Sequence, residues 1–198
     1  MCILELMNNQ EKPIIAICGV GGAGKNSVME IFKQYPDRFS FFVSYTDRPQ
    51  REDDILDESY HFISQEEFSK AIDNNEFMEW EATRGEFRYG RKKEDLDKII
   101  QSGRIPVMNI DVKGAVKFKK LYNVISFFIV PPSKEEALRR MIKRGTDSEE
   151  GVRNRIDRYD LEMGYKDQLD YVIINDDLDQ AQDEILKIIN SRINQPIN

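Results

Sequence analysis

Residues 14–27 read IIAICGVGGAGKNS, a short apolar run that leads into a glycine-rich turn and then into helical sequence. Gly19, Gly24 and Lys25 have the spacing of the phosphate-binding loop found in nucleotide-binding proteins. Glycines let successive backbone N–H groups point at phosphate oxygens, and the following helix adds the partial positive charge of its N-terminus. Lys25 would neutralise the β- and γ-phosphates. This stretch predicts a strand, a phosphate loop and a helix in that order.

The position after the lysine departs from the usual pattern. Asn26 stands where Ser or Thr is common, and a hydroxyl follows one residue later at Ser27. Taken alone, the turn is also compatible with a plain tight connection between a strand and a helix. The candidate nucleotide-binding residues are Gly19, Val20, Gly21, Gly22, Ala23, Gly24, Lys25, Asn26 and Ser27.

Apolar runs of strand length alternate with amphipathic segments along the rest of the chain. We expect strands over residues 13–18, 39–44, 105–110, 123–130 and 171–174. We expect helices over residues 24–34, 65–74, 93–102, 112–121, 134–143, 148–165 and 178–192. Two of these helices begin with the spacing of a capping box, Ser64 to Glu67 and Ser133 to Glu136. The alternation indicates the α/β class, with a parallel sheet covered by helices.

The pattern changes between residues 44 and 89. Short strand-like runs at 60–63, 77–82 and 86–89 surround one helix. We therefore expect a small mixed α/β subdomain inserted after the second core strand.

Composition limits the classes of partner. The 198 residues are 40% hydrophobic and 33% charged, which suits one globular domain. The 36 acidic and 29 basic residues give a net charge of −7, which argues against a nucleic-acid or anionic-membrane surface. Only 2 cysteines occur, and no apolar stretch approaches the roughly 18 residues needed to span a bilayer. We expect a cytoplasmic protein that binds small molecules.

A second candidate anion site follows the second predicted strand. Arg48 and Arg51 lie three positions apart, and Tyr60 follows at a short distance. Guanidinium groups bind phosphate oxygens in pairs, so this cluster suits a second phosphate. The alternative is that both arginines solvate the acidic run at residues 52–54.

Taken together, these segments resemble the guanylate kinase family from about Pro13 to Ile189. The matching segments keep the family's order: the phosphate loop, 44–51, 60–62, 77–80, 89–90, 109–114, 131–133, 144–148 and 172–178. The resemblance implies a P-loop NTPase-type core over about 13–44, 92–143 and 156–192, a GMP-binding subdomain over about 45–91 and a lid over about 144–155. It implies transfer of the γ-phosphate of ATP to GMP with Mg²⁺.

The same resemblance assigns roles to individual residues. It places the acceptor phosphate against Ser44, Arg48, Arg51, Tyr60 and Tyr89, and the guanine base against Glu79 and Asp111. It places ATP against the phosphate loop together with Arg140, Arg144, Asn175 and Asp176. It implies that the catalytic cations are Lys25, Arg51, Arg144 and Arg155, and that Ser27 is the nearest protein neighbour of Mg²⁺.

The chemistry of Glu79 agrees with its implied role. A carboxylate can accept both the N1–H and the exocyclic N2–H of guanine, whereas adenine offers neither donor there. Several residues depart from the family pattern. Arg91 stands where a small hydroxyl residue is usual, Asn109 replaces an aspartate, and Val20-Gly21 replace Pro-Ser. Asp47 lies inside the arginine loop, where like charge would weaken phosphate binding.

Two other functions remain open at this point. Guanylate-kinase-like domains also occur as non-catalytic modules that bind phosphorylated partners, and retention of Lys25 argues against that reading. Arg91 leaves open a kinase of altered base preference, because an additional cation near the base could favour another acceptor or could point into solvent.

Overall fold

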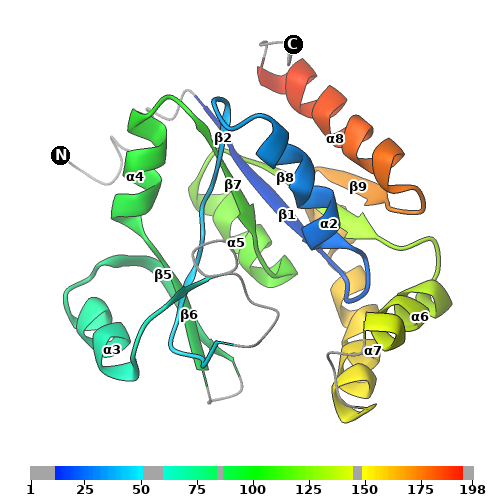
Figure 1. Ribbon diagram of the computed structural model, residues 1–198, viewed down its shortest axis with the longest axis horizontal. Helices are drawn as coiled ribbons and strands as arrows, with labels where there is room; N and C mark the ends of the chain where they lie inside the picture. The colour runs from blue at the N-terminus through cyan, green and yellow to red at the C-terminus, as the bar shows by residue number, and fades with distance from the viewer. Residues whose placement is uncertain (1–11, 51–59, 84–86, 145–148, 194–198) are drawn as a thin grey trace. The chain divides into compact units, whose positions relative to one another are not determined.

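The computed structural model describes residues 12–50, 60–83, 87–144 and 149–193, and their side chains except at 83, 144 and 149–155 (Figure 1). These residues form two compact units. Unit 1 contains the described residues up to Pro36 and from Asn109 onward, and unit 2 runs from Asp37 to Met108. Unit 2 is therefore wider than the subdomain expected over residues 45–91.

Unit 1 is built on parallel strands. β1 (Ile14–Gly19) and β9 (Tyr171–Ile174) both pair in parallel with β8 (Val124–Val130). Every residue of β1 and β8 is buried, as expected for parallel strands with both faces covered. β9 pairs along one side with β8 and alternates between buried and more exposed residues.

Helices surround these strands. After β1 come α2 (Lys25–Met29) and the 3₁₀-helix η1 (Glu30–Gln34). The others are α5 (Val112–Leu121), α6 (Lys134–Arg144), α7 (Glu149–Met163), the 3₁₀-helix η2 (Lys166–Gln168) and α8 (Leu178–Ile193). α5 packs against β1 and β8, whereas α8 packs against β9 and α2.

Unit 2 holds the mixed sheet. Its strand order is β4 (His61–Phe62), β3 (Tyr45–Thr46), β6 (Phe87–Lys92) and β5 (Phe77–Thr83). β3 and β4 are parallel, and the other pairs are antiparallel. The unit also contains β2 (Phe39–Phe41), which pairs in parallel with β7 (Ile105–Asn109), and the helices α3 (Gln65–Asp73) and α4 (Lys93–Gln101). The last residue of β7, Asn109, belongs to unit 1.

The expected fold class and nearly all expected elements are confirmed. One difference concerns residues 24–34, which form α2 and η1 rather than one continuous α-helix. A second difference is β3, which the sequence did not predict. Its two residues are too few to show the alternating pattern of a strand. Within the described residues, no helix is long and apolar enough to cross a bilayer.

Only one of the two expected capping boxes is complete. At α3, Ser64 and Glu67 satisfy each other's backbone N–H groups. At α6, the Ser133 hydroxyl accepts from the Glu136 amide at 3.1 Å. The Glu136 carboxylate instead binds Arg139 and Arg140, because two guanidinium groups compete successfully for it.

A buried serine on β8 anchors the start of β9. Asp170 Oδ2 accepts from the Ser126 backbone N–H at 2.9 Å and from the Ser126 hydroxyl at 2.6 Å. The hydroxyl oxygen in turn accepts from the Asp170 backbone N–H at 2.9 Å. Burial favours a higher pKa for Asp170, but hydrogen bonds from Lys119 and Ser126 outweigh it, so the pKa is lowered.

We expect Asp170→Ala to lower the free energy of unfolding by about 1–3 kcal/mol at pH 7, because it leaves the buried Ser126 groups without their acceptor. Urea denaturation measures the change, and Asp167→Ala, an exposed position three residues earlier, is the matched control. Since the pKa of Asp170 is depressed by folding, its stabilisation is complete above about pH 4 and is lost as the pH falls further. Equal unfolding energies for both variants would contradict this role.

Candidate functional site

The phosphate loop is shaped by close backbone contacts on unit 1. Gly19 has φ +142°, and a Cβ at this position would lie 2.1 Å from the Ile129 carbonyl oxygen on β8. Gly24, the N-cap of α2, has φ +81°, and a Cβ there would lie 2.5 Å from Asn175 Nδ2. Both positions require glycine, since a side chain would meet strain in φ and a steric clash.

Lys25 lies over this loop. Its Nζ donates to the carbonyl oxygens of Gly19 at 2.9 Å and Val20 at 3.1 Å. These two acceptors are uncharged, so they position the ammonium group without neutralising it. Lys25 is also half-buried, which strengthens its interaction with any anion that enters the loop.

Two residues outside the loop hold it in place: Asn175, which directly follows β9, and Arg140 on α6. Asn175 Nδ2 donates to the Ala23 carbonyl at 2.7 Å, and Arg140 Nη1 donates to the Asn175 carbonyl at 2.8 Å. Arg140 Nε binds Glu136 at 2.7 Å, and hydrogen bonds from Arg139 and Arg140 lower the pKa of Glu136 to about 2. The sequence predicted nucleotide contacts for Asn175 and Arg140. The structure adds a positioning role for both.

The predicted Mg²⁺ neighbourhood contains two residues that depart from the usual pattern. Asn109 Nδ2 donates to Asn26 Oδ1 at 3.0 Å, so these two departures meet in space. Ser27 and Asp176 are exposed, and the Ser27 carbonyl accepts from Gln182 on α8 at 2.9 Å. Among the residues that the structure describes, no group of three or more His, Cys, Asp or Glu side chains forms a metal site.

Asp111 has a local structural role in addition to its predicted contact with guanine. Its Oδ1 accepts from the Gly114 backbone N–H at 2.9 Å and caps the N-terminus of α5. A carboxylate at this position also opposes the positive end of the helix dipole. Asp111 belongs to unit 1, with the phosphate loop.

On unit 2, the predicted phosphate-binding residues form an aromatic and cationic cluster. The buried Arg48 guanidinium lies 5.4 Å from the ring centroids of both Tyr60 and Phe62. Tyr60 and Tyr89 meet edge-on at 5.5 Å. Ser44, also predicted at the acceptor phosphate, is buried on the same unit. The structure thus brings Arg48, Tyr60 and Tyr89 together.

Asp47 does not act as the expected unbalanced negative charge in the arginine loop. Its carboxylate accepts from the Arg88 backbone N–H at 2.7 Å and from Arg88 Nε at 2.6 Å. Arg88 on β6 therefore balances the charge of Asp47. The expectation that Asp47 repels phosphate is therefore corrected. The ion pair could not be predicted from the sequence, because its two residues lie 41 positions apart.

Arg91 does not point into solvent, one of the two outcomes considered from the sequence. Its side chain is only 6% exposed, and Nη1 donates to Glu79 Oε1 at 2.8 Å. Glu79 and Arg91 are cross-strand partners on β5 and β6, so the ladder brings them face to face. The predicted guanine-reading carboxylate is therefore already paired with a cation.

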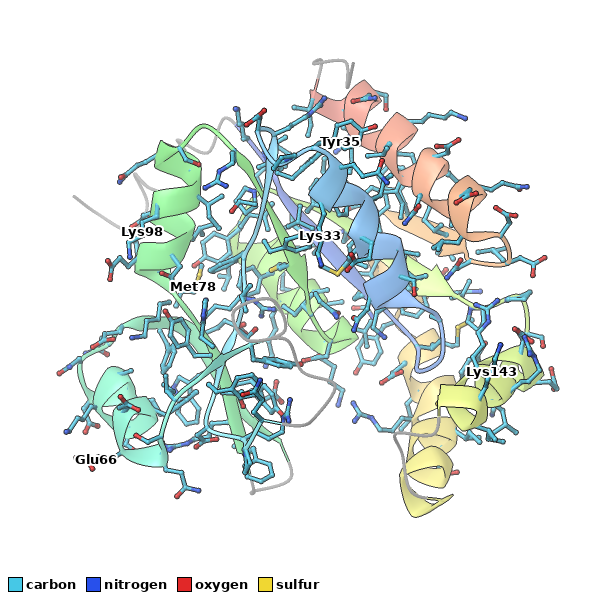
Figure 2. All side chains as sticks on the ribbon, viewed as in Figure 1. Lys33, Tyr35, Glu66, Met78, Lys98 and Lys143 are labelled. Atoms are coloured by element: carbon cyan, nitrogen blue, oxygen red, sulfur yellow. The ribbon has the colours of Figure 1, made fainter. Side chains whose placement is uncertain are left out.

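The remaining predicted residues lie outside the described part of the chain. They are Arg51, the loop at 145–148 and the side chains of Arg144 and Arg155. Lys143, labelled in Figure 2, is an exposed cation one residue before Arg144 on α6.

The comparisons with known proteins agree with this geometry. The family model described as guanylate kinase matches residues 10–192. The chain belongs to the guanylate kinase family. The guanylate kinase of Thermotoga maritima is 35% identical over 179 residues, which cover 90% of this chain and 86% of the relative. That of Chlamydia abortus is 37% identical over 177 residues, with 89% and 86% covered.

Solved structures give the same family. The crystal structure of guanylate kinase from Anaplasma phagocytophilum superposes with a TM-score of 0.72 at 26% sequence identity. It covers 91% of this chain and 86% of the solved chain. The family membership expected from the ordered motifs is confirmed.

Sequence reasoning missed Gln182, which ties α8 to α2 through the carbonyls of Ser27 and Val28. A signal was present, because Gln182 falls on the otherwise apolar buried face of the helix. A polar residue at such a position needs a partner, and the end of a neighbouring helix supplies carbonyl oxygens.

We expect the Cys18 thiol to be inert in the folded protein. Burial raises the pKa of Cys18 to about 12, so the thiolate that reacts with disulfide reagents is nearly absent at pH 8. In a Cys2→Ser background, Ellman's reagent should label Cys18 only after denaturant is added. Labelling of the native protein within seconds would contradict the described burial.

Proposed function

We propose that this chain transfers the γ-phosphate of ATP to GMP and forms ADP and GDP. The observation that carries the proposal is a phosphate loop with its lysine in place, in a chain that belongs to the guanylate kinase family. The relatives from Thermotoga maritima and Chlamydia abortus bear the name guanylate kinase, and their names support this substrate pair.

Unit 1 would hold the donor. Backbone N–H groups of the loop would face the phosphates of ATP, and Lys25 would offset charge on the β- and γ-phosphates. Asn175 would keep the loop open by holding the Ala23 carbonyl to the outside. Arg140 would support Asn175, and with Arg144 and Arg155 it would carry the charge of the transferring group.

Unit 2 would hold the acceptor. Arg48 is kept in place by two aromatic rings, so it would meet the GMP phosphate with little loss of side-chain entropy. The hydroxyls of Tyr60, Tyr89 and Ser44 can donate to the same phosphate, with Arg51 as the second guanidinium. Glu79 would accept the N1–H and N2–H of guanine.

Transfer needs no general base. An anionic oxygen of the GMP phosphate attacks the γ-phosphorus of ATP, and the bond to the β–γ bridging oxygen breaks to release ADP. The protein contributes alignment and positive charge and excludes water, since water would otherwise accept the phosphoryl group.

Mg²⁺ fits the residues of the phosphate loop. Mg²⁺ in kinase sites is held largely by phosphate oxygens and water, with few protein ligands. The exposed Ser27 hydroxyl and the Asn26 amide oxygen, which already accepts from Asn109, are uncharged oxygens suited to such a site. When bound, the ion would neutralise charge between the β- and γ-phosphates. The cytoplasmic location stays a prediction.

The first test is a coupled assay of ADP formation with Mg·ATP and a panel of GMP, dGMP, AMP, CMP and UMP. We expect turnover with GMP and dGMP and, for the others, kcat/KM lower by at least about 100-fold, because none of them offers the Glu79 carboxylate the adjacent ring N–H and amino donors of guanine. No GDP above background would defeat the proposal. If the chain prefers another nucleotide of the panel, that nucleotide is its acceptor and the assignment of GMP is wrong.

The second test separates a kinase from a non-catalytic phosphate-binding module. Lys25→Met should lower kcat by at least about 100-fold, because it removes charge stabilisation at the transferring phosphate. GMP binding, measured by calorimetry, should persist. Lys33→Met is the matched control, since Lys33 is an exposed lysine of η1 that pairs with Glu30. Equal turnover in both variants would show that Lys25 is not a catalytic cation, whereas a wild-type chain that binds GMP without turnover would favour the binding module.

A further inference from the structure

We propose that Arg91 determines specificity for the 6-oxo group of the acceptor purine, and that it does so as one unit with Glu79. The proposal rests on the proposed function, in which Glu79 reads guanine. It assigns to Arg91 the base edge that Glu79 cannot read, the carbonyl oxygen O6.

The geometry of the pair supports this role. Arg91 Nη1 lies 2.8 Å from Glu79 Oε1, and the two residues face each other across the β5–β6 ladder. The Arg91 side chain is 6% exposed and Glu79 is 30% exposed, so the pair is partly withdrawn from water. Its guanidinium carbon lies 5.7 Å from the ring centroid of the buried Phe42, which restricts its rotation.

Only one oxygen of the Glu79 carboxylate is used by this ion pair. Among the described residues, Glu79 Oε2 makes no hydrogen bond, whereas Oε1 accepts from Arg91. A carboxylate oxygen has room for more than one donor, so both oxygens can still accept from a ligand. The ion pair therefore fixes the carboxylate and leaves it able to bind.

The pair has the order of groups that guanine requires. Along its pairing edge guanine carries an acceptor at O6, a donor at N1 and a donor at N2. A guanidinium beside a carboxylate offers a donor followed by two acceptors, the complementary order. Arginine is also a common donor to guanine O6 in nucleic-acid recognition, where it binds O6 together with N7.

Adenine reverses this order at two positions. Its exocyclic amine would direct N–H groups at the guanidinium donors, and its N1 lone pair would face the carboxylate. At both positions groups of the same kind would face each other, N–H against N–H at Arg91 and lone pair against carboxylate at Glu79, so the base gains no hydrogen bond from either side chain and is disfavoured. Arg91 therefore preserves the preference for guanine. It does so through a charged guanidinium, at a position where the family usually has a small residue with a hydroxyl group.

The test compares three acceptors that differ by single groups: GMP, 6-thio-GMP and IMP. 6-Thio-GMP keeps both N–H donors but replaces O6 with a weaker acceptor, whereas IMP keeps O6 and lacks the 2-amino group. Dissociation constants are measured by calorimetry at pH 7 with the full chain, so the readout does not require turnover.

We expect the wild-type chain to bind 6-thio-GMP about 10-fold or more weakly than GMP, because a charge-assisted hydrogen bond is weakened. In Arg91→Val, whose side chain has no hydrogen-bond donor, this ratio should fall close to 1. The ratio of IMP to GMP depends on Glu79 and should stay above about 5-fold in the same variant. Arg91→Lys, which keeps a cationic donor, should give an intermediate 6-thio-GMP ratio.

Lys92→Val is the matched control. Lys92 is the next residue of β6 and pairs with Glu76 at 2.7 Å, so its loss removes a comparable ion pair from the same strand. This variant should keep the wild-type 6-thio-GMP ratio. A thermal melt of each variant identifies loss of folding.

The outcomes separate the two proposals. A wild-type chain that binds no GMP defeats the proposed function. A wild-type chain that binds GMP and 6-thio-GMP equally overturns only the role of Arg91, whether or not any variant folds. If Arg91→Val weakens all three nucleotides by the same factor, Arg91 is structural and the inference is wrong.

Discussion

The candidate site depends on one constraint, the close approach of the backbone around the phosphate loop. Gly19 lies against the Ile129 carbonyl, and Gly24 lies against the amide of Asn175, at distances that no side chain allows. The Asn175 side chain then holds the Ala23 carbonyl by a hydrogen bond. These contacts fix the backbone of the strand-to-helix connection on which the proposed phosphate binding depends.

A second theme is that two carboxylates of unit 2, near the predicted acceptor site, are already paired with arginines. Asp47 is satisfied by Arg88, and Glu79 is paired with Arg91. A chain with a net charge of −7 can bind polyanions only where cations are concentrated and held in place. Arg48, which lies against two aromatic rings, and Lys25, which is held by two carbonyls, are the cations that we propose for this role.

The sequence predicted the fold well where one periodicity dominated. The buried strands β1 and β8 and the helix α5 lie where the apolar pattern placed them, because burial on both faces leaves a continuous signal. It failed at β3, which is too short to show a period, and at the second half of residues 24–34, where the helix tightens to 3₁₀ geometry.

The candidate site was predicted in its residue types but not in its pairings. Motif order identified Arg48, Tyr60, Asn175 and Glu79, yet the partners of Asp47, Asn26 and Glu79 lie 41, 83 and 12 residues away. A single sequence carries no information on such pairs unless they share a helix face. Arg91 is the clearest case. From the sequence it is an isolated cation, and only the structure shows that it faces Glu79 on β5.

The amide bridge between Asn26 and Asn109 couples two residues that depart from the usual pattern. Each residue alone looks like the loss of a useful group, a hydroxyl in one case and a carboxylate in the other. Because Asn109 Nδ2 donates to Asn26 Oδ1, a change at either position alters the partner of the other. Substitutions at Asn26 and Asn109 should therefore have non-additive effects, and neither position can be understood in isolation.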